Sequence, residues 1–170
     1  MEFWDLYDAE RQPLHRTRAR GSRLRRGEYH VVVFVWIFDG NGKTLLTKRS
    51  PEKKSYPNYW EATGGAVQAG ETSLQAITRE LREETGIVAE PSEFRLVSSV
   101  CESKHNSFCD VYLLQKSVPL SEITFQKGET CDARWVNREE LERIIAGGRL
   151  STPDVRRYRE LAEEFKKYLW

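Results

Sequence analysis

Four acidic residues stand out in residues 64–88, GGAVQAGETSLQAITRELREETGIV, because this segment otherwise predicts a helix with an apolar face. Glu80, Glu83 and Glu84 are spaced i, i+3 and i+4, so on a helix they share an arc of about 100°. Like charges at this spacing destabilise a helix unless a cation offsets them. Carboxylates, waters and a phosphate oxygen together match the oxygen ligands that Mg²⁺ prefers. The alternative interpretation is a solvated Glu/Arg helix face.

The helix that carries these acids is predicted by its apolar spacing and by its ends. Three apolar residues at i, i+3 and i+7 form a core-facing stripe: Leu74, Ile77 and Leu81. Thr72 or Ser73 can cap the helix, and Gly86 can end it in the left-handed conformation. The three glutamates then lie beside the core, and Arg79 is expected to lean away from them.

The spacing of the whole segment is more specific than the acidic triad. Gly65 is followed after five residues by Glu71, and seven further residues precede the run from Arg79 to Ile87, RELREETGI. This pattern matches every defined position of the Nudix box, so the chain resembles the Nudix hydrolase superfamily. The upstream VVVFVWIFDGNGKTLLTKRS and the downstream CDARWVNREEL also resemble the family's first hairpin and late strand–helix junction.

The resemblance implies an α/β (α+β) fold, a Nudix-type α/β/α sandwich with a mixed β-sheet and a loop-helix-loop catalytic segment. On this basis we expect an N-terminal β-hairpin extension at 1–27 and a Nudix domain at 28–148. Residues 149–170 are expected to form a C-terminal amphipathic helix packed on the same domain.

The resemblance also implies a catalytic set. Nudix enzymes cleave diphosphate linkages with water and Mg²⁺ or Mn²⁺. The expected metal ligands are the three helix carboxylates and one backbone carbonyl: Glu80, Glu83, Glu84 and Gly64. Arg79 is expected to hold the glutamates in place, and Glu71 to pair with Arg79 or to reach a metal-bound water. Gly65 and Gly86 are expected to set the turns at the two ends of the helix. Glu83, or Glu129 outside the box, is the expected base for the attacking water.

The expected substrate is a small-molecule diphosphate, namely a nucleoside diphosphate or one of its derivatives. Lys48 and Arg49, with Lys53 and Lys54, lie near the box in sequence and could hold phosphates. Candidate stacking partners for a base are four aromatic residues, each of which could instead be core or rim: Trp60, Tyr59, Phe108 and Phe125.

Two other activities remain open. The sequence Ala62-Thr63-Gly64-Gly65 replaces the more frequent Leu-Pro-Gly-Gly, and with YHVVVFVWIF and KKSYPNYW it resembles the branch of isopentenyl-diphosphate isomerase. That enzyme needs a Cys and a His beside the box, and no Cys or His lies between His30 and Cys101, which favours hydrolysis. The third alternative is a non-catalytic diphosphate-binding module, against which the intact box argues.

Composition narrows the class of protein. The formal net charge is +1 and no apolar run reaches the length of a membrane span, so we expect neither nucleic acid nor a membrane as partner. An early basic cluster is interpreted as a solvated face: Arg16, Arg18, Arg20, Arg23, Arg25 and Arg26. Three cysteines without metal-type spacing predict reduced thiols in a cytoplasmic protein: Cys101, Cys109 and Cys131.

The remaining elements are expected to build the sheet around the helix. A hairpin is predicted at 2–8 and 13–20, and Trp4 and Tyr7 on its edge are expected to pair with a second subunit as a homodimer. Further strands are predicted at 28–39, 43–49, 59–64, 93–102, 107–116 and 131–136. Helices are predicted at 137–145, capped by Asn137, and at 151–170.

Overall fold

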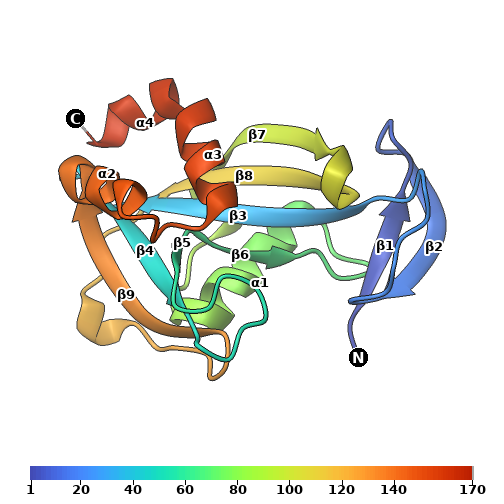
Figure 1. Cartoon of the computed structure of the whole chain (residues 1–170), viewed down its shortest axis with the longest axis horizontal. Helices are drawn as coiled ribbons and strands as arrows, with labels where there is room; N and C mark the ends of the chain where they lie inside the picture. The colour runs from blue at the N-terminus through green and yellow to red at the C-terminus, as the bar shows by residue number, and fades with distance from the viewer. Residues whose placement is uncertain (170) are drawn as a thin grey trace. The chain divides into compact units, whose positions relative to one another are not determined.

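The fold was analysed in a computed structural model, which describes residues 1–169 (Figure 1). The strands are β1 (Phe3–Tyr7), β2 (Pro13–Ala19), β3 (His30–Phe38), β4 (Lys43–Arg49), β5 (Trp60–Glu61), β6 (Thr63–Ala66), β7 (Phe94–Glu102), β8 (Ser107–Gln115) and β9 (Thr130–Asn137). The helices are α1 (Ser73–Thr85), α2 (Arg138–Ala146), α3 (Thr152–Glu160) and α4 (Ala162–Leu169), with short 3₁₀ turns at Pro91–Glu93, Ser103–His105 and Leu120–Glu122. The predicted α/β class with a mixed sheet is confirmed.

Strand pairing follows the order β5-β4-β3-β8-β7, with β6 paired to β3 and β9 paired to β4. The antiparallel register of β4 with β9 runs from Lys43 opposite Asn137 to Arg49 opposite Thr130. The single strand predicted at 59–64 is in fact two short strands, because Trp60–Glu61 pairs with β4 while Thr63–Ala66 pairs with β3. This switch of partner between adjacent residues depends on tertiary pairing and leaves no local signal.

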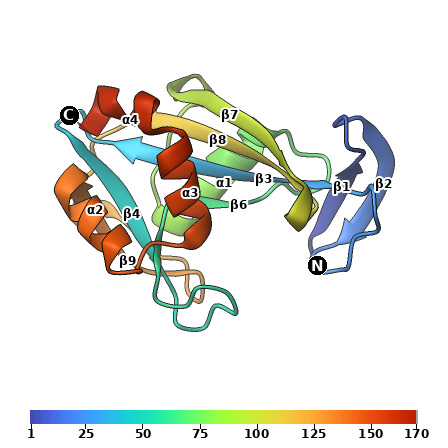
Figure 2. The same ribbon diagram turned by 45° about the horizontal axis from the view of Figure 1, so that its top comes forward.

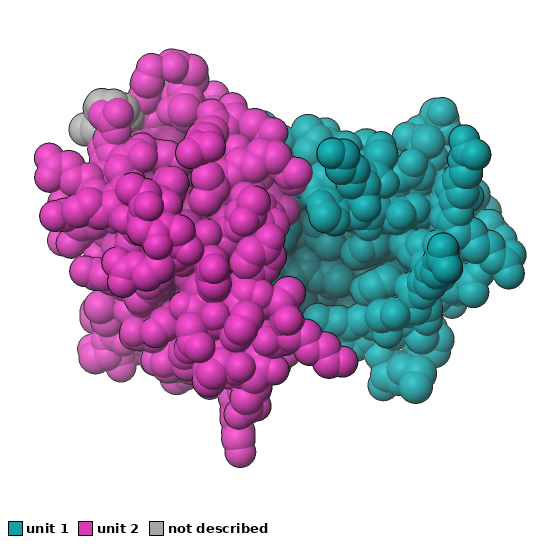
Figure 3. Space-filling model, in the orientation of Figure 1, with its two compact units in different colours: residues 1–35, 64–80, 89–113 teal, residues 36–63, 81–88, 114–170 magenta. Residues whose placement is uncertain are grey.

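The described residues divide into two compact units (Figure 3). Unit 1 contains residues 1–35, 64–80 and 89–113, and unit 2 contains residues 36–63, 81–88 and 114–170. Four elements, β3, β6, β8 and α1, contain residues of both units. The predicted boundaries at 27 and 148 stay predictions.

In unit 1 the N-terminal hairpin is held by its own pairing and by a bridge from Tyr7 to Tyr29, the residue before β3 (Figure 1). The backbone N–H groups of Tyr7 and Tyr29 each donate to the other residue's carbonyl at 2.9 Å. The indole of Trp4 stacks on the imidazole of His30, with ring centroids 4.1 Å apart. The expectation that Trp4 and Tyr7 lie on an open edge is therefore wrong, since their rings and backbone are used within the chain. Phe3 is the exposed aromatic of β1.

An ion pair between partly exposed Arg11 and buried Asp110 fixes the turn of this hairpin to β8. Arg11 donates from Nη1 to Oδ1 of Asp110 at 2.7 Å and from Nη2 to Oδ2 at 2.6 Å. Ser99 donates its hydroxyl to the same carboxylate at 2.8 Å. Burial alone would raise the pKa of Asp110, but the hydrogen bonds from Arg11 and its neighbours outweigh it, so the pKa lies below its ordinary value. Asp110 is therefore ionised in the folded protein.

In unit 2 the C-terminal segment forms two helices, α3 and α4, where one was expected (Figure 2). Leu161 leaves the helical conformation with φ −101° and ψ 15°, although no Gly or Pro marks the break. Phe165 of α4 packs 4.9 Å from the Trp36 ring, and Tyr158 of α3 packs 6.2 Å from it. Packing around β3 thus decides a break that helical periodicity did not predict. Trp170, part of the predicted helix, lies outside the described residues.

The other end signals behave as expected. Asn137 caps α2 by accepting from the Glu140 N–H at 2.9 Å, and the Glu140 carboxylate accepts from the Asn137 N–H at 3.0 Å.

The three cysteines are free thiols: Cys109 is buried, while Cys101 and Cys131 are exposed. Within residues 1–169 the longest apolar helix falls short of what a membrane crossing requires.

Candidate active site

Helix α1 has the predicted bounds. The Gln75 N–H donates to the Thr72 hydroxyl at 3.2 Å, and the Thr72 N–H donates to the Gln75 side chain at 2.8 Å, so Thr72 is the cap. The helix ends at Thr85, and Gly86 follows with φ +73°. A Cβ at Gly86 would also lie 2.4 Å from the Thr124 hydroxyl, so both conformation and space favour glycine there.

The three glutamates differ in burial although they share one helix. Ile77 and Leu81 are fully buried, which confirms the core-facing stripe at these two positions, while Leu74 is half-buried. Glu80 is 9% exposed and Glu84 is 6% exposed, while Glu83 is exposed. The placement of acids beside the core is therefore confirmed for Glu80 and Glu84. Glu83 is the one carboxylate of the three that water reaches freely.

Arg79 is at the centre of the charged contacts. Its Nε donates to Oε1 of Glu71 at 2.7 Å and its Nη2 to Oε2 of the same residue at 2.9 Å. Its Nη1 donates to Oε1 of Glu80 at 2.8 Å, and Nη2 also reaches the Ala66 carbonyl at 3.2 Å. The expectation that Arg79 leans away from the acids is wrong for Glu80, because the long side chain bends back along the helix. The expected pairing of Arg79 with Glu71 is present.

These contacts keep the groups charged. The hydrogen bonds from Arg79 lower the pKa of Glu71, and those same contacts raise the pKa of Arg79 despite its partial burial. A fork of two parallel hydrogen bonds also fixes the guanidinium plane. Arg79 therefore both compensates the local negative charge and orients Glu80.

Two glycines of β6 have no room for a side chain, although neither adopts a positive φ. A Cβ at Gly65 would lie 2.3 Å from Oε1 of Glu80, so the carboxylate occupies the space of a side chain. A Cβ at Gly64 would lie 2.1 Å from the Val33 carbonyl oxygen. The expectation that Gly65 sets a turn is wrong, because Gly65 lies within strand β6 and serves by having no side chain.

The donor chemistry fits a divalent cation. Glu80 and Glu84, which are buried one helical turn apart, and exposed Glu83 carry the type of oxygen ligand that Mg²⁺ or Mn²⁺ prefers. Ligation by these residues and by the Gly64 carbonyl stays a prediction. However, within residues 1–169 no group of three or more His, Cys, Asp or Glu side chains is already arranged to hold a metal ion. Glu80 is held by Arg79, so the three carboxylates do not form a preassembled cluster.

Unit 2 contains the residues predicted to bind substrate. Arg49 donates from Nη1 to Oε2 of Glu61 at 2.6 Å and from Nε to the Ser55 carbonyl at 2.9 Å. The ammonium of Lys48 lies 5.9 Å from the ring centroid of Trp60. Trp60 is 8% exposed, which leaves little ring area for stacking on a base.

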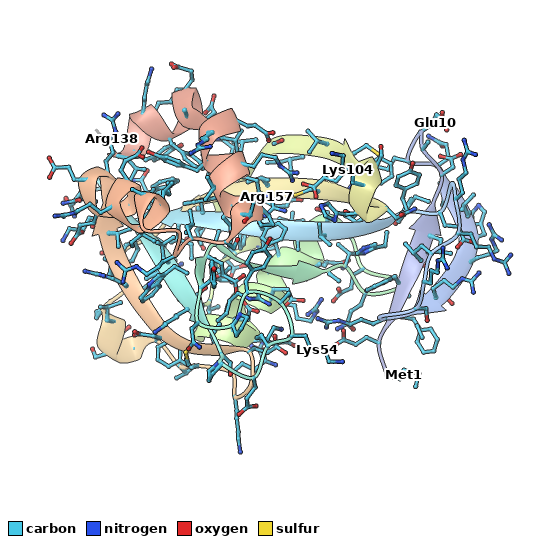
Figure 4. All side chains as sticks on the ribbon, viewed as in Figure 1. Met1, Glu10, Lys54, Lys104, Arg138 and Arg157 are labelled. Carbon is cyan, nitrogen blue, oxygen red and sulfur yellow. The ribbon has the colours of Figure 1, made fainter. Side chains whose placement is uncertain are left out.

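The loop between β4 and β5 adds further charged groups. Lys53 forms an ion pair with Glu129, and the Glu129 carbonyl accepts from the Ser50 N–H at 2.8 Å. Lys54, labelled in Figure 4, lies in this loop and is exposed. Glu129 is therefore engaged by a lysine, and its role toward a substrate stays a prediction.

Three of the four candidate stacking partners remain to be placed. Tyr59 is half-buried beside Trp60, with its ring 5.5 Å from that of Tyr56. Phe108 is buried, and Phe125 is 43% exposed. Phe125 is thus the one of the four with an open ring.

Two buried carboxylates of unit 2 were not singled out from the sequence. Asp154 accepts from the Ser151 hydroxyl at 2.6 Å and from Arg157, labelled on α3 in Figure 4, at 3.2 Å. Burial raises the pKa of Asp154, and burial raises that of Glu61 to about 7. The pattern Ser151-Thr-Pro-Asp154 is a helix-cap signal that could have marked Asp154. Glu61 has no such local signal.

The fold and the arginine-held acidic helix define a protein of the Nudix class. The model of the NUDIX domain family matches residues 28–165, and the chain belongs to this family. It is 41% identical over 149 residues to an uncharacterized Nudix hydrolase of Listeria monocytogenes, covering 87% of each chain. The protein is a Nudix hydrolase.

Other similarities support the fold and the branch. An isopentenyl-diphosphate Delta-isomerase of Klebsiella pneumoniae is 28% identical over 151 residues, covering 83% of this chain and 79% of that protein. The solved structure of DR0079 from Deinococcus radiodurans superimposes with a TM-score of 0.75 at 26% identity, covering 99% of this chain and 100% of that one. A bifunctional NMN adenylyltransferase/ADP ribose pyrophosphatase of Francisella tularensis, complexed with AMP and a manganese ion, has a TM-score of 0.64. At 21% identity, covering 81% of this chain and 42% of that one, it shows the fold alone.

Proposed function

We propose that this Nudix hydrolase uses Mg²⁺ or Mn²⁺ to cleave the diphosphate linkage of a nucleoside diphosphate or one of its derivatives. The observation that carries the proposal is the arrangement on α1. Arg79 bonds both Glu71 and Glu80, and the carboxylate of Glu80 rests against Gly65. A positioned carboxylate of this kind is suited to hold a hard cation.

Each residue of the box then has a distinct task. Glu80, Glu83 and Glu84, with the carbonyl of Gly64, would hold the cation. When bound, the cation supplies positive charge that screens the diphosphate and acidifies a water. Glu83 is exposed, so it can accept a proton from water, whereas Glu84 is buried.

The nucleoside part of the substrate is supported more indirectly. Lys48, Arg49 and Lys53 gather positive charge at the end of β4, although Arg49 and Lys53 already pair with carboxylates. Phe125 has the open aromatic ring that stacking on a base requires. The fold neighbour in complex with AMP and manganese motivates nucleotides and Mn²⁺ as the first compounds to assay.

The test is a substrate panel with divalent cations. Purified protein is incubated with Mg²⁺ or Mn²⁺ and with nucleoside di- and triphosphates, sugar nucleotides and dinucleotides. We expect turnover of at least one nucleoside diphosphate compound, and EDTA should abolish it. A folded protein that turns over no member of the panel would contradict the proposal.

Two substitutions test the residue assignment. Glu83→Gln and Glu84→Gln should each lower kcat by about a hundredfold or more, since each removes a metal ligand. The melting temperature should change little for Glu83, which is exposed. Glu139→Gln on α2 changes the same chemical group at an exposed position outside the box and should retain full activity. Full activity in both box variants would show that the ligand assignment is wrong.

Isopentenyl-diphosphate isomerisation is the second candidate, favoured by the relative of that name. In this chain Thr63 and Gly64 stand just before the box, and the ring of His30 is stacked on Trp4. We therefore expect no dimethylallyl product from isopentenyl diphosphate. Formation of that product at a rate above hydrolysis would reverse the order of the two candidates.

The cytoplasmic location and the homodimer stay predictions. Light scattering tests the predicted homodimer. A mass near 19.9 kDa would remove the homodimer, and twice that mass would support it.

A further inference from the structure

Unit 1 contains a pocket of about 630 Å³ whose walls include none of the box residues. Three stretches line it: Trp4 of β1, residues 21–30, and the turn between β7 and β8 that Lys104 marks in Figure 4. The volume lies within the range of small-molecule sites in proteins. The Nudix resemblance did not account for the early basic cluster, and two arginines of that cluster line this pocket.

The residues that line the pocket carry positive charge and include no acidic residue. Arg23 and Arg26 line it, and no Asp or Glu is among the lining residues. Within the described part of the chain, neither arginine forms an ion pair or a side-chain hydrogen bond. Other arginines of the same cluster behave differently: Arg20 pairs with Glu2 at 2.6 Å, and Arg18 approaches buried Glu28 to 3.6 Å. Arg23 and Arg26 are exposed, as a solvated face predicts, but they lie together at a pocket whose lining contains no acidic residue.

The remaining walls supply neutral polar groups and a rigid aromatic surface. His105 and Asn106 contribute an imidazole and an amide from the turn between the two strands, although the Asn106 Nδ2 already donates to the Glu28 carbonyl at 3.0 Å. Trp4 and His30, stacked 4.1 Å apart, form another wall. The indole Nε1 of Trp4 and the Nδ1 of His30 are buried and form no hydrogen bond within residues 1–169.

We propose that this pocket binds a small soluble molecule through a phosphate group, which the guanidinium groups of Arg23 and Arg26 hold. Planar guanidinium groups match phosphate oxygens geometrically and stay charged throughout the physiological pH range. Asn106 and the aromatic wall then contact the remainder of the ligand. The site is independent of the proposed hydrolysis, because it contains no box residue and needs no divalent cation.

Binding is measured by calorimetry in EDTA with three probes: inorganic phosphate, ribose 5-phosphate and AMP. The protein carries Glu83→Gln, so that residual metal-dependent binding at the box does not contribute. We expect saturable binding of at least one probe, weakened by added salt because the contact is ionic. In NMR spectra recorded with the same probes, the amide chemical shifts that change should be those of residues 21–30 and 103–106.

The double substitution Arg23→Gln/Arg26→Gln should weaken this binding by about tenfold or more, since two charged hydrogen-bonding groups are lost. The control Arg156→Gln/Arg159→Gln removes the same charge from exposed positions of α3 and should leave the affinity unchanged. If both double variants weaken binding equally, the loss of affinity depends only on the net charge of the protein, and the proposal is overturned. Absence of saturable binding by any probe at about 10 mM would overturn it as well. The activity panel is scored separately, so failure here leaves the hydrolase proposal standing.

Discussion

Substitution of Gly65 by Ala tests whether the position of the Glu80 carboxylate controls activity. The new methyl carbon would lie 2.3 Å from Oε1 and 2.4 Å from Cδ of Glu80, whereas ordinary contacts begin near 3.4 Å. The carboxylate must therefore move by about 1 Å, a misplacement that can reduce a rate by about a hundredfold. Since Gly65 lies in a strand without positive φ, the backbone itself tolerates alanine.

Gly65→Ala is expected to lower the stability of the protein less than it lowers the activity. Arg79 keeps both hydrogen bonds to Glu71, and only the bond to Glu80, at 2.8 Å, is disturbed. A charged hydrogen bond contributes about 1.5–3 kcal/mol, and partial replacement by water lowers the loss to about 1–2 kcal/mol. We expect kcat/KM to fall far more than the free energy of unfolding, measured by steady-state kinetics and urea denaturation.

Gly70→Ala is the matched control at the other end of the same loop. Gly70 has φ +84°, and a Cβ there would meet no atom within 4 Å. Alanine should therefore cost about 1–2 kcal/mol of backbone strain while leaving Glu80 in place and activity intact. Wild-type activity in Gly65→Ala, or the same loss of activity in Gly70→Ala, would refute the reasoning.

Two further predictions concern buried charges. Burial raises the pKa of Glu61 to about 7 despite its partner Arg49, so between about pH 4.5 and 7 the folded state holds a proton that the unfolded state has released. The free energy of unfolding should fall as pH rises across that interval and be flat above it, and Glu61→Gln should flatten the urea-denaturation profile. Arg11→Met leaves the buried carboxylate of Asp110 without its partly exposed guanidinium partner and should cost about 1–3 kcal/mol. Exposed Arg156→Gln should cost less than about 0.5 kcal/mol, and equal losses in the two variants would contradict the ion pair's importance.

Local signals accounted for most elements but not for how they pair. The bounds of α1 follow from Thr72, Gly86 and the apolar stripe, all of which act within a few residues of one another. The exchange of partners after Trp60–Glu61 and the break at Leu161 do not follow, because each depends on strands or aromatic rings distant in sequence. The same limit applies to Glu61, whose pKa is set by burial in the folded unit.

The box spacing by itself determined the family, the catalytic helix and the identity of its acidic residues, because these reside in the order of neighbouring side chains. Only the tertiary structure decided that Gly65 makes room for a carboxylate, that Arg79 reaches Glu80, and that Trp4 and His30 close one wall of a pocket. The contacts of Gly65 with Glu80 and of Trp4 with His30 join residues that are distant in sequence, whereas Arg79 and Glu80 are neighbours on α1 and only the direction of the guanidinium needed the structure. Periodicity along the chain reports which face a residue takes, and it carries no information about which distant group that face meets.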